Sequence, residues 1–285
     1  MLLNRVFSIV VLAGAAYGAD KTKVLLVDGQ NNHKWAETSP VMKKLLEETG
    51  LFAVDVATSP AKGADMAPFR PKFADYKVVV SNYNGEPWSA ETKASFEKYV
   101  RGGGGFVSVH AADNSFPEWP AYNEMIMLGG WGNRTEKDGP YAKFREGKLV
   151  IDNKPGKGGH HGKRHAYSLT TRDARHPVMA GLPDKWMHHT DELYDSLRGP
   201  AKNIHLLATA FSAPDTGGTG EDEPMLMVTR HGKGRVFHTT LGHDVEAMRC
   251  AGFIVTLQRG VEWAATGKVT QKVPADFPGA QTSLR

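Results

Sequence analysis

The sequence predicts an α/β protein with a three-layer, flavodoxin-like arrangement around a mostly parallel sheet. Short apolar segments alternate with segments in which apolar residues recur at helical spacing, an order typical of parallel sheets. Several strand segments are apolar on both faces, as in sheets covered by helices on both sides. A third observation is the run of glycines at 102–105, which leads into an apolar segment ending at His110. In such folds, reactive groups gather at the carboxyl ends of strands, where His110 is expected.

The first part of the chain contains four predicted strands with helices between them. We expect these strands at residues 23–29, 54–58, 76–81 and 106–109. Because residues 54–58 alternate between apolar and polar, this strand is expected near an edge of the sheet. Ser39 and Pro40 are typical of a helix start, and Ser89 is expected to cap a second helix. The four glycines precede a strand rather than a helix, so they do not form a phosphate-binding loop.

The middle of the chain, residues 112–198, is less regular. We interpret it as an insertion within a single domain of residues 19–270. Segments 149–152 and 166–170 have the pattern of antiparallel strands in an inserted sheet or flap. Connections of this length without regular structure are usually functional.

Regular alternation returns in the last third of the chain. We expect a strand at 204–209, a hairpin of 225–230 and 234–241, a long helix at 245–266 and an irregular tail at 271–285. Asp244 is a candidate cap for the long helix.

The first 18 residues have the pattern of a secretion signal. Arg5 supplies a basic start, residues 6–16 are apolar, and Ala16 and Gly18 are the small residues of a cleavage site before Ala19. We therefore expect an exported protein, periplasmic or secreted. No other apolar segment of the sequence has the length of a transmembrane helix.

Composition argues against two features, a nucleic-acid-binding surface and an internal disulfide. The formal net charge is only +4, and the basic residues are scattered, which argues against a nucleic-acid partner. Cys250 is the only cysteine, so an internal disulfide is excluded. It falls inside the predicted last helix and is interpreted as a small buried apolar residue.

Three histidines follow predicted strand ends: His33, His110 and His243. If these strands are parallel neighbours, the three imidazoles converge on one crevice. A histidine in such a place can act as a general acid or base, or ligate a metal through a neutral ring nitrogen. Each one taken alone is also consistent with an ordinary loop, core or bystander histidine.

Two other segments combine histidines with potential partners. Residues 188–194 place two histidines beside Asp191 and Glu192, whose carboxylates could orient an imidazole or bind a metal. Residues 158–165 form a basic, histidine-rich loop that we interpret as exposed. Metal sequestration by this loop is a further hypothesis, and it requires His160, His161 and His165 to converge with a carboxylate.

Four aromatic residues are candidates for a sugar-binding wall: Tyr83, Trp119, Tyr122 and Trp131. Their rings suit stacking on sugars, although aromatic residues more often belong to the core. Asn32, in the loop after the first strand, is a candidate substrate-binding residue. Signatures of P-loop, dinucleotide-binding and serine-hydrolase sites are absent from the sequence.

Several segments together resemble the ThuA-like, or trehalose-utilisation, family of the class I glutamine amidotransferase-like superfamily. They are residues 24–27 with His33, 103–112, 176–178 with Gly181 and Leu182, 191–194, and 234–237 with 241–244. The resemblance implies the flavodoxin-like sheet. It also places His110 near the position of the nucleophilic cysteine in amidotransferases, so glutamine hydrolysis through a thioester is not expected.

The resemblance implies carbohydrate metabolism, acting on a disaccharide, a glycoside or a 3-keto form made by a partner sugar oxidoreductase. We expect His110 and His243 to be the central acid–base groups, with His33 as a third member and Asp191 and Glu192 as carboxylate partners. A divalent metal, if bound, is expected at His33, His110, His243 and Glu192. The alternative is a non-catalytic sugar-binding module. Imidazole nitrogens within about 3–5 Å of one another would favour a shared metal or proton relay.

Overall fold

A computed structural model describes residues 20–280, so the expected secretion signal at 1–18 lies outside the described residues. One mixed sheet of 11 strands forms the centre of the fold, and its main path has the order β2-β1-β3-β4-β13-β12-β11-β8-β9. These strands are β1 (Thr22–Asp28), β2 (Phe52–Thr58), β3 (Val78–Ser81), β4 (Gly105–Val109), β8 (His165–Thr171), β9 (Lys185–Asp191), β11 (His205–Phe211), β12 (Asp222–His231) and β13 (Gly234–Thr239). The α/β class predicted from the sequence is confirmed.

The strands from β2 to β13 in this order are parallel. β1, β3, β4 and β13 are largely buried on both faces, whereas β2, which lies at the edge as its alternating pattern predicted, has exposed residues. The alternation of side chains along β1 shows the two faces. Val24 and Leu26 belong to one core cluster, whereas Leu25 and Val27 belong to another. Helices on both sides therefore cover the parallel half, in three layers.

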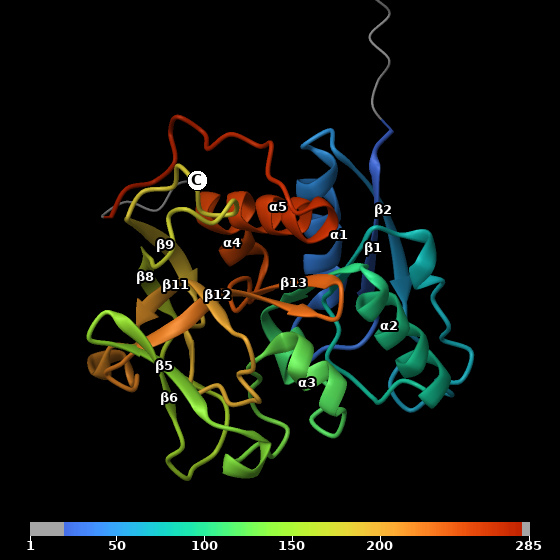
Figure 1. The fold of residues 1–285 in the computed structure, drawn as a ribbon, viewed down its shortest axis with the longest axis horizontal. Coiled ribbons are helices and arrows are strands. Elements are labelled where there is room, and N and C mark those ends of the chain that lie inside the picture. The colour runs from blue at the N-terminus through green and yellow to red at the C-terminus, as the bar shows by residue number, and fades with distance from the viewer. Residues whose placement is uncertain (1–19, 281–285) are drawn as a thin grey trace, which may run out of the picture.

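Five α-helices surround the sheet: α1 (Trp35–Glu47), α2 (Ala90–Gly102), α3 (Pro120–Ile126), α4 (Val245–Met248) and α5 (Ala251–Thr266). Figure 1 shows α1 and α5 together on one face and α2 and α3 on the other. Apolar residues of α5 and α1 contribute to the first core cluster, and Phe96 and Val100 of α2 contribute to the second.

The start of α1 corrects a prediction. The helix begins at Trp35, and Pro40 lies inside it, so Ser39 does not cap it. Instead, the hydroxyls of Ser39 and Thr38 each accept a hydrogen bond of 3.0 Å from the Asn82 amide at the end of β3. The Ser39 hydroxyl, which the local pattern assigned to helix capping, is therefore used in a tertiary contact with Asn82.

The other predicted helix starts have mixed outcomes. Ser89 caps α2, accepting a hydrogen bond from the Thr92 amide, and Asp244 caps α4 through Ala247. The predicted long helix is broken, because Cys250 has an extended backbone between α4 and α5. The break lets Gly252 pack against the Trp186 indole, where a Cβ would lie 2.6 Å from Nε1. Cys250 is buried, as expected, but at the break rather than inside a helix.

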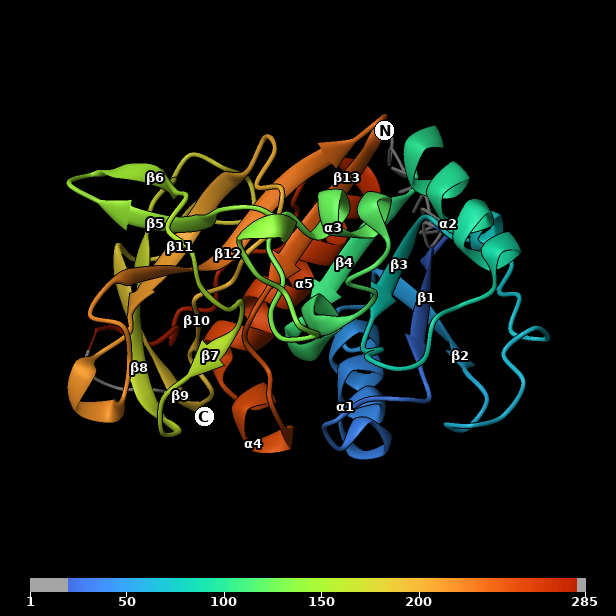
Figure 2. The same ribbon diagram turned by 90° about the horizontal axis from the view of Figure 1, so that it is seen from below.

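The middle region is not a separate flap. Strands β8 and β9, which derive from it, extend the central sheet through antiparallel pairing with β11. The hairpin of β5 (Tyr141–Arg145) and β6 (Lys148–Asp152) branches from β12, as Figure 2 shows. A second small sheet pairs β7 (His160–His161) with β10 (Tyr194–Asp195).

The direction of β9 determines which edge of the sheet carries the site. Four successive antiparallel pairings separate β13 from β9, so β9 runs in the same direction as the parallel strands. Its carboxyl end therefore lies at the same edge as those of β1, β4 and β13. Helix α5 contacts both β13 and β9 although three strands separate them, which means that the sheet curves around α5.

Two further features complete the description. Residues 268–280 contain no helix or strand, and Val273 and Phe277 pack against the core. Within residues 20–280, no helix is both long and apolar enough to cross a membrane.

Candidate active site

Four strand ends bring three histidines and a glutamate together. His33 follows β1, His110 follows β4, His243 follows β13, and Glu192 follows β9. One carboxylate oxygen of Glu192, Oε2, lies 3.5 Å from Nε2 of His33 and 3.5 Å from Nε2 of His110. The other, Oε1, lies 3.2 Å from Nε2 of His243. We call these four residues the His–Glu cluster.

His110 occupies a strained turn between β4 and the 3₁₀-helix of His110–Asn114. Its φ is +47°, a value that residues other than glycine adopt infrequently and that often marks functional sites. The ring is buried, and its Nδ1 lies 2.7 Å from the carbonyl oxygen of Thr240. This carbonyl can only accept a hydrogen bond, so the contact places a proton on Nδ1 and turns Nε2 toward Glu192.

The other two rings are oriented in the same way. Nδ1 of His33 lies 3.3 Å from Oδ1 of Asn31, and Nδ1 of His243 lies 3.3 Å from Oδ2 of Asp244. In each ring of the cluster, therefore, Nδ1 faces an oxygen of a neighbouring residue and Nε2 faces the Glu192 carboxylate.

Asp191 holds this arrangement in place from the protein interior. Its carboxylate accepts hydrogen bonds from the backbone amides of Glu192, Gly242 and His243, at 2.8, 2.8 and 3.1 Å. It also lies 2.8 Å from Nε2 of His188. The side chains of Asp191 and His188 are fully buried, so Asp191 is a positioning residue rather than one that touches substrate.

Charge is concentrated on the Glu192 carboxylate. Burial alone would raise its pKa, but the polar contacts with the neighbouring His110 and His33 imidazoles and the positive charge of His110 outweigh burial and hold the pKa well below its usual range. Burial lowers the pKa of His110, but the polar contact with the Glu192 carboxylate and the charge of Asp191 overcome this effect and raise it. Burial lowers the pKa of His243, and the attraction of Glu192 does not compensate. Glu192 therefore stays ionised over the physiological pH range.

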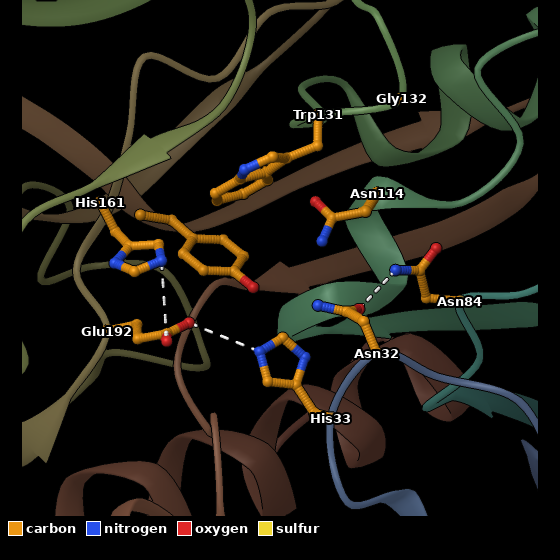
Figure 3. Close-up of a pocket in the computed structure, with 9 residues that line it drawn as sticks. Asn32, His33, Asn84, Asn114, Trp131, Gly132, His161 and Glu192 are labelled. Carbon is orange, nitrogen blue, oxygen red and sulfur yellow. Dashed lines mark hydrogen bonds and ion pairs between the residues drawn. The ribbon is translucent and has the colours of Figure 1, made fainter.

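A polar pocket of about 340 Å³ opens onto the cluster. Figure 3 shows His33 and His161 reaching the Glu192 carboxylate from two sides of this pocket, with Trp131 across the pocket from His33. The remaining walls include three amide side chains, of Asn32, Asn84 and Asn114, together with Tyr194. The Asn84 amide donates a hydrogen bond of 2.6 Å to the side-chain oxygen of Asn32.

Buried polar contacts support the pocket walls. The guanidinium of Arg134 is buried and donates to the backbone carbonyls of Asn114, Ser115 and Gly130, which fixes the two segments carrying Asn114 and Trp131. Trp131 has a φ of +49°, and its ring centroid lies 4.6 Å from that of Tyr194.

Comparisons with known proteins agree on one family. The ThuA family, described as trehalose utilisation, matches residues 23–264. The chain belongs to the ThuA family. This membership confirms the resemblance seen in the sequence and associates the chain with carbohydrate metabolism.

Solved structures support the same conclusion. A ThuA-like protein from Parabacteroides merdae ATCC 43184 is 50% identical and superposes with a TM-score of 0.91, over 93% of this chain and 97% of its own. A ThuA-like protein from Bacteroides uniformis ATCC 8492 is 18% identical, with a TM-score of 0.60 over 90% and 96%, and shows the fold alone. No curated protein gives a match.

Three of the predicted sugar-binding residues of this ThuA protein need correction. Tyr83, Trp119 and Tyr122 are buried, with 0%, 5% and 1% of their surface exposed, and they pack in the second core cluster below α2. Their polar atoms bind the protein itself. The Tyr83 hydroxyl donates to the carbonyl of Glu86, the Tyr122 hydroxyl to that of Ala112, and the Trp119 indole to the Glu97 carboxylate. They do not line the pocket, whereas Trp131 and Asn32 do.

The histidine-rich loop is largely exposed, as interpreted, but its histidines have partners within the protein. His160 pairs with Asp195 at 2.9 Å, and Nε2 of His161 lies 3.7 Å from Glu192 in the pocket wall. Nδ1 of His165 lies 2.7 Å from the carbonyl oxygen of Lys163. The three side chains have three different partners, so the metal-sequestration hypothesis lacks its required convergence.

Sequence reasoning did not place five of the pocket-lining residues at the site: Asn84, Asn114, Gly132, His161 and Tyr194. The strand-end rule would have found Asn84, which follows β3, and Asn114, which lies in the turn after β4. His161 reaches the pocket through the pairing of β7 with β10, for which the sequence gives no signal.

The cluster meets the geometric condition for a shared centre. Ligand-type atoms of His33, His110 and Glu192 all lie within 4.8 Å of one another, and His243 adjoins the second carboxylate oxygen. Imidazole nitrogen and carboxylate oxygen are common ligands of divalent transition metals. The four residues can therefore either hold a metal or pass protons among themselves.

Proposed function

We propose that this ThuA protein is an exported enzyme that processes a disaccharide, a glycoside or a 3-keto form of one. One observation carries the proposal: a pocket walled by three amide side chains and an indole opens directly onto the His–Glu cluster. Amide groups donate to and accept from sugar hydroxyls, and an indole face suits stacking on a sugar ring. The family's association with carbohydrate metabolism supports the same class of substrate.

The reaction we propose is proton removal next to a ketone. A base removes the proton from the carbon beside the 3-keto group, and the electron pair forms a carbon–carbon double bond. The glycosidic C–O bond then breaks, and the leaving oxygen takes up a proton. His33 and His161 border the pocket and are suited to these proton transfers, whereas the permanently ionised Glu192 holds their rings.

A panel assay tests the proposal. The purified protein is incubated with disaccharides and their 3-keto forms, and products are followed by mass spectrometry. We expect Glu192→Gln to lower kcat/KM by about 100-fold or more, because an amide no longer holds the imidazoles. Trp131→Ala is expected to raise KM more than it changes kcat.

The matched control is Glu246→Gln. Glu246 is an exposed glutamate on α4 whose carboxylate lies 3.2 Å from Nε2 of His189. This pair has the same residue types as the Glu192–histidine contacts but lies outside the pocket. It is expected to leave turnover unchanged. Equal losses in both glutamate variants would contradict the proposal.

A non-catalytic sugar-binding module is the second candidate, favoured by the three amides in the pocket wall. Titration calorimetry with the same sugars separates the two. Binding that Trp131→Ala weakens, without turnover of any sugar by the unaltered protein, would replace the enzyme by the binding module.

Export is proposed from the pattern of residues 1–18. We expect the natively produced protein to begin at Ala19 when its amino terminus is sequenced. A mature protein that begins at Met1 would contradict export by this route.

A further inference from the structure

We propose that the His–Glu cluster binds one divalent transition-metal cation. Its ligands are Nε2 of His33, Nε2 of His110 and the Glu192 carboxylate, with Nε2 of His243 on the fourth side. Only the cation's role with a sugar rests on the proposed function, whereas its binding stands on the geometry below.

The spacing of the ligand atoms matches that of a metal site. Two atoms that each lie about 2.1 Å from a tetrahedral centre are about 3.4 Å apart. The distances from the Glu192 oxygens to the three Nε2 atoms are 3.5, 3.5 and 3.2 Å. Charge-assisted hydrogen bonds are shorter, at about 2.7–2.9 Å. The contacts are thus longer than those of a charge-assisted hydrogen bond. His33, His110 and Glu192 have the spacing of three ligands around one ion, and His243 adjoins the second carboxylate oxygen.

The orientation of the rings is the second argument. A histidine that ligates a metal usually donates its other ring N–H to a carbonyl or carboxylate, which fixes the ring. His110 has the carbonyl of Thr240 at this position, at 2.7 Å, whereas Nδ1 of His243 lies 3.3 Å from the Asp244 carboxylate without a hydrogen bond to any described residue. For His33, the carbonyl oxygen of the Asn31 side chain is at this position, at 3.3 Å.

An unsatisfied buried atom is the third argument. Nε2 of His110 is fully buried and has no hydrogen-bond partner among the described residues. A buried polar group without a partner destabilises the folded state, and such groups in native proteins call for an explanation. Coordination of an ion at this nitrogen would satisfy it.

The donor set restricts the choice of ion. Imidazole nitrogen favours zinc, iron, cobalt, nickel and copper, whereas magnesium and calcium prefer oxygen ligands. His110 lies in the interior and His33 and Glu192 in the pocket wall, so an ion held among them would have one side toward the pocket. A sugar carbonyl or hydroxyl oxygen there could complete its coordination and be polarised by it. An ion would occupy Nε2 of His33, so the proton transfers proposed for His33 and His161 would then fall to His161, which lies farther from the carboxylate.

Metal titration of the full chain tests the inference. The protein is stripped with a chelator, loaded with Zn²⁺ or Co²⁺, and passed through a desalting column before metal analysis. We expect one equivalent per chain, and with Co²⁺ a visible absorption spectrum of a low-coordinate site. Glu192→Gln and His33→Gln are expected to weaken the affinity by at least about tenfold.

Controls separate this site from adventitious binding. Glu246→Gln and His189→Gln remove an exposed glutamate–histidine pair and should retain the full equivalent. Circular dichroism verifies that each variant is folded. Glu192→Gln preserves side-chain size, so a folded variant is expected even where His110→Ala would not give one. Absence of retained metal in the unaltered protein, or retention unaffected by Glu192→Gln and His33→Gln, would overturn the inference.

The outcome for the metal is distinguishable from the outcome for the proposed function. A protein that holds one ion at the cluster but neither binds nor converts sugars would refute the function and keep the metal site. A stripped protein that converts sugars at the full rate, with no gain on loading, would keep the function and refute the ion's role in it.

Discussion

Asp191 organises two groups of the site although its own side chain does not reach the pocket. Its carboxylate accepts hydrogen bonds from the backbone amides of Gly242 and His243, in the turn after β13, and from the backbone amide of Glu192. The pKa of His188 shows the strength of this local charge. Burial lowers that pKa, but the Asp191 carboxylate raises it to about 9, so the buried pair is ionic. Leaving one member of such a pair without its partner is strongly destabilising.

We therefore predict that Asp191→Asn destabilises the protein. An amide of the same size loses the charge and places N–H donors opposite backbone donors, so the free energy of unfolding should fall by about 2–4 kcal/mol. Urea denaturation measures this change. Asp173→Asn is the matched control, since Asp173 pairs with His205, whose side chain is half exposed, and a change within about 0.5 kcal/mol is expected there. Similar effects of the two substitutions would contradict the positioning role.

Individual residues differ in how far the sequence predicted them. The three strand-end histidines could be placed, because the order of strands and helices fixes which loops meet at one edge. Aromatic residues could not, because a ring that packs in a core and a ring that lines a pocket look alike in sequence. Tyr83 and Trp119 pack in the core, whereas Trp131 lines the pocket.

Helix α2 and strand β4 meet at the glycine run, and each glycine has a different environment. Gly103 ends α2 with a φ of +119°. A Cβ on Gly105 would lie 2.6 Å from the backbone oxygen of Ala264 in α5, whereas a Cβ on Gly102 would meet nothing within 4 Å. The start of β4 therefore requires a residue without a Cβ at position 105, because α5 packs closely against the backbone there.

A pair of substitutions tests this difference. Gly105→Ala should lower the free energy of unfolding by about 2–3 kcal/mol, because α5 must move away from the centre of the sheet. Gly102→Ala, in the last turn of α2, should be neutral or stabilising by up to about 1 kcal/mol. Thermal or urea unfolding of the two variants measures both. A Gly105→Ala protein as stable as the unaltered chain would show that β4 and α5 do not pack as described.

Element boundaries departed from prediction where tertiary contacts outweigh local preference. Ser89 is exposed to solvent on one side and caps α2 as its pattern indicates. Ser39, with the same pattern, is buried against Asn82 and lies within α1. The interruption before α5 follows the docking of Gly252 on Trp186, a residue distant in sequence.

At the scale of the whole molecule, curvature of the sheet completes the site. Strand β9 lies four positions from β13 in the sheet, yet its end contacts the loop after β13 through Asp191. Because the sheet curves around α5, the end of β9 lies beside the ends of the parallel strands. Glu192 is thereby placed among the three histidines. Periodicity predicted the parallel half of the sheet, but the path of the antiparallel half depends on pairings that no local pattern encodes. The residue pattern of 188–194 marked Asp191 and Glu192 as possible partners of an imidazole, but it did not predict that the end of β9 lies beside those of β1, β4 and β13.

The central claim is that Glu192 and the strand-end histidines form one metal-binding centre at the edge of the pocket. Anomalous diffraction at the zinc edge, from crystals of the protein loaded with one equivalent of Zn²⁺, tests this claim most directly. We predict a single strong peak about 2.0–2.2 Å from Nε2 of His33, from Nε2 of His110 and from a Glu192 oxygen. A loaded crystal with no peak at this position, or with its strongest peak in the loop of residues 158–165, would contradict the account.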